Sequence, residues 1–141
     1  MNYKDLKFSR DTDRNFIGEL RKRVSTYFEE NNISKYANAH MVWKTIILIS
    51  AYVAPYLLMV TGVITGTWPL LLTWMFMGAV MSGIGFSIMH DANHGAYSKN
   101  KKVNRYLGYI INLVGGSSVN WKIQHNVLHH TYTNVEGADE D

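Results

Sequence analysis

Hydrophobic residues are distributed unevenly along the chain, and its middle third contains no charged residue. From residue 45 to residue 89 there is no Asp, Glu, Lys or Arg, whereas residues 1–44 and 95–141 are polar. The run from Thr45 to Ile64 is long enough, at about 1.5 Å per helical residue, to cross a hydrocarbon layer about 30 Å thick. A turn at residues 65–68 separates it from a second run, Pro69 to Met89. The pattern predicts an all-α membrane protein built on a transmembrane helical hairpin.

Residues 12–30 show an amphipathic pattern instead. Apolar side chains recur at helical spacing from Phe16 to Phe28, while most charged residues fall on the other side. Thr12 or Asp13 can cap the start of this helix, and the Asn-Asn pair at 31–32 ends it. Two interpretations stay open. The helix either packs on the rest of the protein, which we favour, or lies on a membrane surface.

The basic residues predict the orientation of the hairpin. Of the 14 Lys and Arg residues, nine precede residue 45, none lies in the turn and five follow residue 95. By the positive-inside rule both ends of the chain are cytoplasmic and the turn is outside. We therefore expect a cytoplasmic N-terminal region (1–44), two transmembrane helices (45–89) and a cytoplasmic segment (90–141). A bacterial inner membrane suits this arrangement.

The segment after the hairpin divides into short elements. Residues 95–104 form a basic loop suited to lipid headgroups. Residues 105–114 are apolar but too few to span a membrane, which predicts an interfacial or partly buried helix. Residues 115–118 (Gly-Gly-Ser-Ser) break that helix, and the acidic end at 136–141 is expected to be loose. Nothing predicts a nucleic-acid partner, because the basic residues form no dense stripe with aromatic residues.

Five of the six histidines fall between residues 90 and 130. His90 and His94 are four residues apart, as are His125 and His129, so each pair shares one face of a helix. His130 lies about 100° further round an α-helix and can point to a second centre. A lone histidine is most often an ordinary polar residue, and we read His40 in that way. Two pairs plus an adjacent histidine, close to a membrane segment, favour a metal site instead.

The donor set narrows the choice of metal. The chain has no Cys, so thiolate ligands and disulfides are excluded. Five histidines in two groups exceed what one zinc site uses. Asp91, between the first two histidines, has two equally good interpretations: it accepts a hydrogen bond that orients an imidazole, or it is a solvated charge.

The two histidine motifs resemble those of a known family. His90-Asp-Ala-Asn-His94 reads H-D-x-x-H, and Trp121 to His130 reads W-x-x-x-H-x-x-x-H-H. In this order and spacing, after hydrophobic segments, they are similar to the first two histidine boxes of membrane fatty acid desaturases, most of all bacterial acyl-lipid or acyl-CoA desaturases. The resemblance implies that His90, His94, His125, His129 and His130 bind iron, and that Trp121 lines the acyl channel. An interfacial anchor is an equally good interpretation of Trp121.

The resemblance also implies a reaction and its partners. The family inserts a double bond into an acyl chain at a centre of two non-haem irons, using O2 and electrons from NAD(P)H. We expect a separate electron donor, a ferredoxin or a b-type cytochrome, because no His-Pro-Gly-Gly cytochrome signature occurs here. The third box of the family, Q-x-x-H-H, does not occur in residues 1–141. We therefore expect these residues to be an N-terminal fragment that is inactive alone.

Two alternatives keep part of this interpretation. Similar boxes occur in membrane hydroxylases and ketolases that act on alkyl, sphingolipid or carotenoid substrates, so the reaction could differ while the metals stay. The chain could also be a membrane hairpin that binds metal without catalysis. Product analysis separates the first alternative, and metal content with turnover separates the second.

Overall fold

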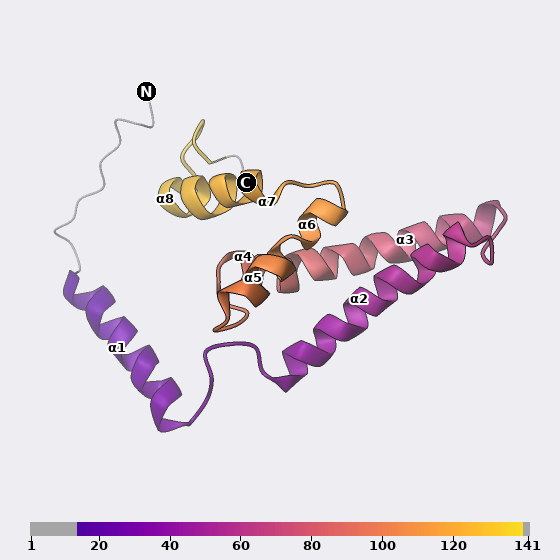
Figure 1. Ribbon diagram of the computed structural model, residues 1–141. Coiled ribbons are helices and arrows are strands. Elements are labelled where there is room, and N and C mark those ends of the chain that lie inside the picture. The colour runs from indigo at the N-terminus through magenta and orange to yellow at the C-terminus, as the bar shows by residue number, and fades with distance from the viewer. Residues whose placement is uncertain (1–13, 140–141) are drawn as a thin grey trace. The chain divides into compact units, whose positions relative to one another are not determined.

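The computed structural model describes residues 14–139, and this part of the chain contains helices and no strands (Figure 1). The predicted caps Thr12 and Asp13 lie outside the described residues. The elements, in order, are α1 (Arg14–Glu30), α2 (Ala39–Val60), α3 (Thr67–Gly83), η2 (Ile84–Met89), α4 (His90–Asn93), α5 (Lys101–Gly108), α6 (Ile110–Leu113), α7 (Ser118–Trp121), η3 (Lys122–His129) and α8 (His130–Tyr132). The segments η2 and η3 are π-helical.

Helices α2 and α3 pack against each other as the predicted hairpin (Figure 1). The Asn38 side chain caps α2 by accepting a hydrogen bond from the Met41 amide at 2.9 Å. In the turn between the helices, Gly62 and Gly66 have φ values of 73° and 87°, a region that favours glycine. Pro69 lies in the first turn of α3, where a missing N–H costs nothing.

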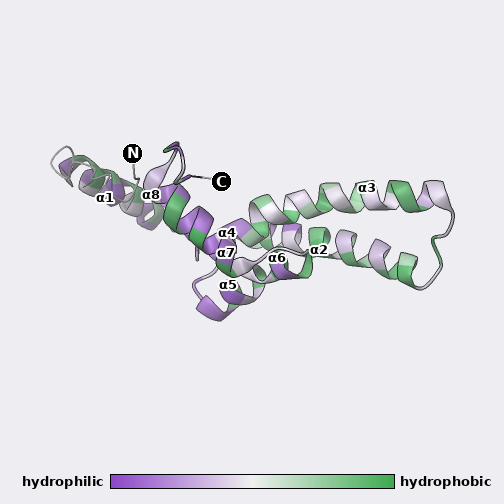
Figure 2. Ribbon diagram, turned by 90° about the horizontal axis from the view of Figure 1, so that it is seen from above, coloured by the Kyte–Doolittle hydropathy of each residue, from purple (hydrophilic) through white to green (hydrophobic). Residues whose placement is uncertain are grey.

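Both helices of the hairpin are long and apolar enough to cross a membrane. The first is α2, with 22 residues, and the second runs without a break through α3, η2 and α4, Thr67–Asn93, with 27 residues. Only 6% and 22% of their most apolar windows are buried within the protein. Helices in the core of a soluble protein would instead be mostly buried, so these outward apolar side chains suit lipid. The green and pale colours of α2 and α3 contrast with the purple of α5 (Figure 2).

The boundaries of these helices differ from the prediction. Charge alone placed the first helix at 45–64, but α2 begins earlier, at Ala39, because Asn38 caps it, and ends at Val60. The glycines of the second helix differ in how closely they approach α2. A Cβ added at Gly78 or Gly85 would meet nothing within 4 Å, whereas one at Gly83 would lie 3.5 Å from the Leu48 side chain of α2. Close approach of the two helices therefore occurs at Gly83.

The best-buried apolar cluster lies at the end of the hairpin where α3 continues into η2 and α4. Its buried members are Val80, Ile84, Ile88, Ala92 and Tyr97. Side chains of α2, α5 and α6, such as Leu48, Leu107 and Ile110, pack around it. The hairpin is thus best packed at the end where the first histidine motif begins, and this packing fixes the backbone that carries His90.

The segment after the hairpin is more broken than predicted. The Asn100 side chain accepts from the Lys102 amide at 2.9 Å and starts α5 at Lys101, so the end of the expected basic loop is helical. The single helix expected at 105–114 is two short helices that break at Tyr109. The glycine break is confirmed: Gly115 has a φ of 90°, and the next helix starts at Ser118.

Helix α1 ends at Glu30, as the Asn-Asn pair predicted, and Asn32 takes a φ of 51°. Arg23 bonds Glu19 at 2.8 Å on its exposed polar face. Most of the apolar stripe is also exposed within the described residues, with Phe16 at 60% and Tyr27 at 58%. Whether this stripe contacts protein or membrane stays a prediction.

Candidate metal centre

The first histidine pair follows directly from the second long helix. The π-helical segment η2 ends where the His90 amide bonds the Gly85 carbonyl, five residues back. The helix then closes with His94, whose amide bonds the His90 carbonyl at 3.0 Å. The two rings lie edge to face with their centroids 4.5 Å apart. His90 is half-buried and His94 exposed. The prediction that these rings share one face is confirmed.

A hydrogen-bonded loop holds the backbone just after His94. Gly95 takes a φ of 74°, which turns the chain. The buried Asn104 side chain donates to the carbonyls of Gly95 and Ser98 at 3.0 and 2.7 Å. It also accepts from the Ser98 amide at 2.8 Å. One side chain of α5 thus forms hydrogen bonds with three backbone groups of the loop. These bonds hold the backbone in place directly after the first histidine motif.

Asn93 ties the same motif to the end of α5. Its amide nitrogen lies 3.0 Å from the sulfur of Met89 and donates to the Gly108 carbonyl at 3.4 Å. A Cβ added at Gly108 would come within 3.0 Å of the Asn93 Cγ and closer still to its Oδ1. Only glycine fits at this contact between α4 and α5.

Asp91 contacts the ring next to it. Its Oδ1 lies 3.3 Å from His90 Nδ1, and its side chain is 45% exposed. Its backbone carbonyl accepts from the amides of Ala96 and Tyr97 at 2.8 and 3.2 Å. The contact is long and partly solvated. Its role in orienting His90 stays a prediction.

The second histidine motif lies on η3 and α8, drawn in yellow in Figure 1. The His125 and His129 rings stack at 5.2 Å with 16° between their planes, so their predicted common face is confirmed. The His130 ring lies 5.0 Å from His125 and 5.4 Å from His129. Its ring is edge-on to both of them, at interplanar angles of 85° and 71°, and whether it points to a second centre stays a prediction. The His130 amide bonds the His125 carbonyl five residues back, which places these two residues one turn apart.

Trp121 lies one turn before His125 and stacks on its ring. The centroids are 4.4 Å apart and the planes differ by 25°. Neither sequence-based interpretation anticipated this contact. The indole covers one face of the His125 imidazole and restricts its rotation. Whether Trp121 also lines an acyl channel stays a prediction.

Sequence reasoning missed Asp139, which belonged to a tail expected to be loose. Its Oδ1 lies 2.9 Å from His129 Nδ1, and its side chain is only 8% exposed. The tail is folded at least as far as this residue. The signal was the pair Asn134 and Gly137, two residues that tolerate the left-handed conformation and can turn the chain back.

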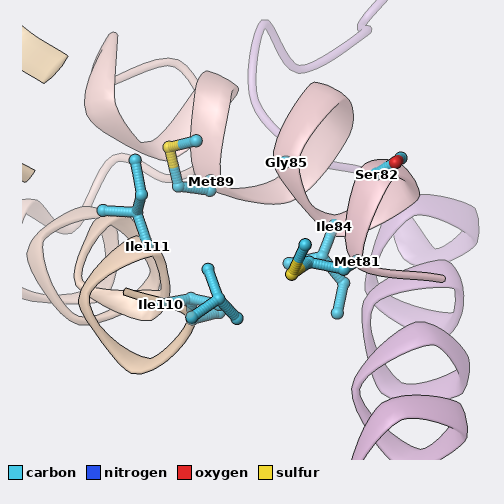
Figure 3. Close-up of a pocket in the computed structure, with 8 residues that line it drawn as sticks. Met81, Ser82, Ile84, Gly85, Met89, Ile110 and Ile111 are labelled. Carbon is cyan, nitrogen blue, oxygen red and sulfur yellow. The ribbon is translucent and has the colours of Figure 1, made fainter. Parts of the chain in front are cut away.

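An apolar cavity of about 210 Å³ lies beside the first motif (Figure 3). It is bounded on one side by the helix that leads into His90 and on the other by α6, and the close-up shows Met89 and Ile111 near each other. Its lining residues are Met81, Ser82, Ile84, Gly85, Met89, Ile110, Ile111 and Val114. Apart from the hydroxyl of Ser82, these side chains suit an apolar ligand.

The donors on these helices fit a transition metal. Imidazole is a good ligand for iron, and a carboxylate at Nδ1 orients the ring of a metal-binding histidine. His90 and His129 both have such a carboxylate partner. An apolar helical hairpin followed by two histidine-rich helical segments defines the class: an all-helical protein with two possible membrane helices and two histidine motifs suited to a metal.

Comparison with known proteins specifies the family. The sequence pattern of the fatty acid desaturase family matches residues 66–141, which is more than half of the chain. The chain belongs to the fatty acid desaturase family. The match includes both histidine motifs, so the resemblance drawn from them is confirmed.

Several curated relatives match over most of this chain. An sn-1 linoleoyl-lipid 6-desaturase of Arthrospira platensis is 44% identical over 88% of this chain and 33% of its own length. The enzyme of the same name from Synechocystis is 36% identical over 95% of this chain and 36% of its own. An acyl-lipid (8-3)-desaturase of Physcomitrium patens is 33% identical over 96% of this chain and 28% of its own. The chain spans about a third of these relatives. No solved structure matches it.

Proposed function

We propose that the intact protein is an acyl-lipid desaturase, which inserts a double bond into the acyl chain of a membrane lipid. Family membership and the arrangement of histidines support the proposal. The three relatives described above are named as linoleoyl-lipid or acyl-lipid desaturases, which favours a lipid-linked acyl chain over acyl-CoA. The observation that carries the proposal is the pairing of imidazoles on both motifs, at ring distances of 4.5 and 5.2 Å.

The five histidines of the two motifs are proposed to hold two non-haem irons. Removing hydrogen from an unactivated methylene needs an oxidant that no side chain supplies, and an iron centre that activates O2 supplies it. The residues of this chain provide neutral nitrogen ligands, and Asp91 orients His90. Electrons come from NAD(P)H through a separate donor, a ferredoxin or a b-type cytochrome.

The structure also suggests where the substrate chain lies. The apolar cavity borders Met89, the residue before His90, and it opens between two helices of the same packed unit (Figure 3). An acyl chain in this cavity would lie beside the first histidine pair and exclude water from it. Lipid would reach the cavity directly if the long helices span the membrane, as their length and apolar surface support.

The test is to express the intact protein in a host of known lipid composition and to analyse its fatty acids by mass spectrometry. New double bonds are expected from the wild type. Single His→Ala changes at residues 90, 94, 125, 129 and 130 should each remove the product and lower the iron bound per protein. His40→Ala is the matched control: His40 is exposed in the first turn of α2, and we expect full activity.

Each outcome has a distinct meaning. Full activity after loss of any one of the five histidines removes that residue from the centre. Hydroxylated or keto products in place of double bonds would replace the proposal by the hydroxylase or ketolase alternative. Iron without any product would favour the non-catalytic hairpin. Residues 1–141 expressed alone should hold less iron than the intact protein, because five imidazoles are too few ligands for two irons.

A further inference from the structure

In the described part of the chain, the contact between His129 and Asp139 is shorter than the contact between His90 and Asp91. The Nδ1 to Oδ1 distance is 2.9 Å, against 3.3 Å for His90 and Asp91. The Asp139 side chain is 8% exposed, whereas that of Asp91 is 45% exposed. A carboxylate withdrawn from water holds its partner in one geometry more firmly than a solvated one does.

The chain is built to return Asp139 to this position. Asn134 and Gly137 have φ values of 62° and 77°, which reverse the chain twice after α8. The amides of Ala138 and Asp139 bond the Val135 carbonyl at 3.1 and 3.0 Å, and Ala138 is buried. The second oxygen of Asp139 accepts from the Asn134 amide at 2.7 Å. Both carboxylate oxygens are therefore engaged, one with the turn and one with His129.

We propose that Asp139 is a positioning residue that fixes the orientation and tautomer of His129 for metal binding. The Nδ1–H of His129 donates to Oδ1, so the ring proton stays on Nδ1 and the lone pair stays on Nε2. Carboxylate partners of this kind also make the imidazole a more basic ligand. The inference rests on the proposed metal centre. It adds that residues 133–139 form part of that centre.

The sharpest test is Asp139→Asn in the intact protein. The Asn oxygen can still accept from the Asn134 amide, so the turn is kept. The Asn nitrogen can only donate, so it would bond an unprotonated Nδ1 and leave the proton on Nε2, the atom needed for the metal. Loss of such a partner lowers metal affinity by about 10- to 100-fold. Glu136→Gln is the matched control: it makes the same change in charge in the same turn at an exposed residue.

Ferrous iron affinity of the metal-free protein would be measured by competition with a chelator, together with the Mössbauer spectrum and the melting temperature. We expect Asp139→Asn to bind iron at least tenfold more weakly than Glu136→Gln, with the same melting temperature in the metal-free state. Equal affinities would overturn the inference. So would a metal-free Asp139→Asn protein that melts well below the control, because the residue would then act only by holding the turn.

His129→Ala separates failure of this inference from failure of the proposed function. If His129→Ala loses iron while Asp139→Asn keeps it, the metal centre stands and the role of Asp139 is wrong. If His129→Ala retains all the iron and the wild-type spectrum, His129 is not a ligand, and both the proposed ligand set and this inference fail.

Discussion

At the scale of single residues, Gly108 is where a small change should disturb the first histidine pair. A Cβ at this position would run into the Asn93 side chain, one residue before His94. We expect Gly108→Ala to cost about 1 to 3 kcal/mol, the usual cost of overpacking a well-packed site. Thermal unfolding of the purified protein in detergent would measure the loss, and iron content would show whether the displaced Asn93 carries His94 with it.

The matched control for this prediction is Gly78→Ala. A Cβ at Gly78, within α3, meets nothing within 4 Å. Alanine is favoured over glycine in a helix by up to about 1 kcal/mol, so this change should be neutral or slightly stabilising. If both variants unfold at the same temperature, the close contact between Gly108 and Asn93 does not exist in the folded protein.

The same scale shows which features of the site could be predicted. The common face of each histidine pair followed from a spacing of four residues, because helical geometry is local. Asp139 could not be placed in this way. Asp139 contacts His129, which lies ten residues earlier in the chain, because the turn between them contains two residues in the left-handed conformation. No periodic pattern in the sequence describes such a turn. The bond from the His130 amide to the His125 carbonyl, five residues back, was missed because sequence carries no simple signal for a π-helical segment.

At the scale of elements, Tyr97 ties the loop after the first histidine pair to the start of α2. Its hydroxyl and that of Thr45 share a buried hydrogen bond of 2.7 Å, and its carbonyl accepts from the Ala37 amide at 3.0 Å. Tyr97→Phe keeps the packing and removes only the hydroxyl. We expect a loss of about 0.5 to 1.5 kcal/mol in unfolding free energy, and no more, because Thr45 still donates to the Met41 carbonyl at 2.9 Å.

Chemical unfolding of purified variants would check the Tyr97 prediction, with Tyr106→Phe as the control. Tyr106 is 71% exposed on α5, so its change should leave the midpoint where it is. If the Tyr97 and Tyr106 variants unfold alike, the bond to Thr45 does not hold the loop against α2. A loss of iron in Tyr97→Phe alone would show that this bond also positions the first histidine pair.

The elements themselves were predictable to different degrees. The long helices followed from 45 consecutive uncharged residues, since hydrophobicity and length alone decide whether such a run can span a membrane. Their ends depended on capping: with Asn38 as its cap, α2 starts at Ala39 and not at residue 45. The short helices after the hairpin were harder to predict, because their boundaries depend on tertiary contacts such as Asn104 with Gly95, which have no local pattern.

At the scale of the whole molecule, the length of the second long helix predicts where the first histidine motif lies relative to the proposed membrane. His90 lies 23 residues beyond the start of α3 at Thr67, which is roughly 35 Å at 1.5 Å per residue. The hydrocarbon core is about 30 Å thick, so His90 would leave it at the side opposite the Gly62–Gly66 turn. Exposed Trp43 and Trp68 lie near opposite ends of the hairpin, where aromatic residues mark the two membrane surfaces.

This geometry and the charge pattern give a prediction of orientation. Nine basic residues precede residue 45, none lies in the turn and five follow residue 95, so both ends should be cytoplasmic. Residues 1–141 contain no native cysteine to interfere with labelling. We would introduce single cysteines at Ser34, Thr65 and Lys99, and treat intact cells with a maleimide that cannot cross the membrane. Thr65→Cys should be labelled from outside, and the other two only after the cells are permeabilised. Labelling of Ser34→Cys or Lys99→Cys in intact cells would show that the orientation is the reverse of the predicted one. The first histidine pair would then lie outside, away from the cytoplasmic NAD(P)H on which the proposed reaction depends.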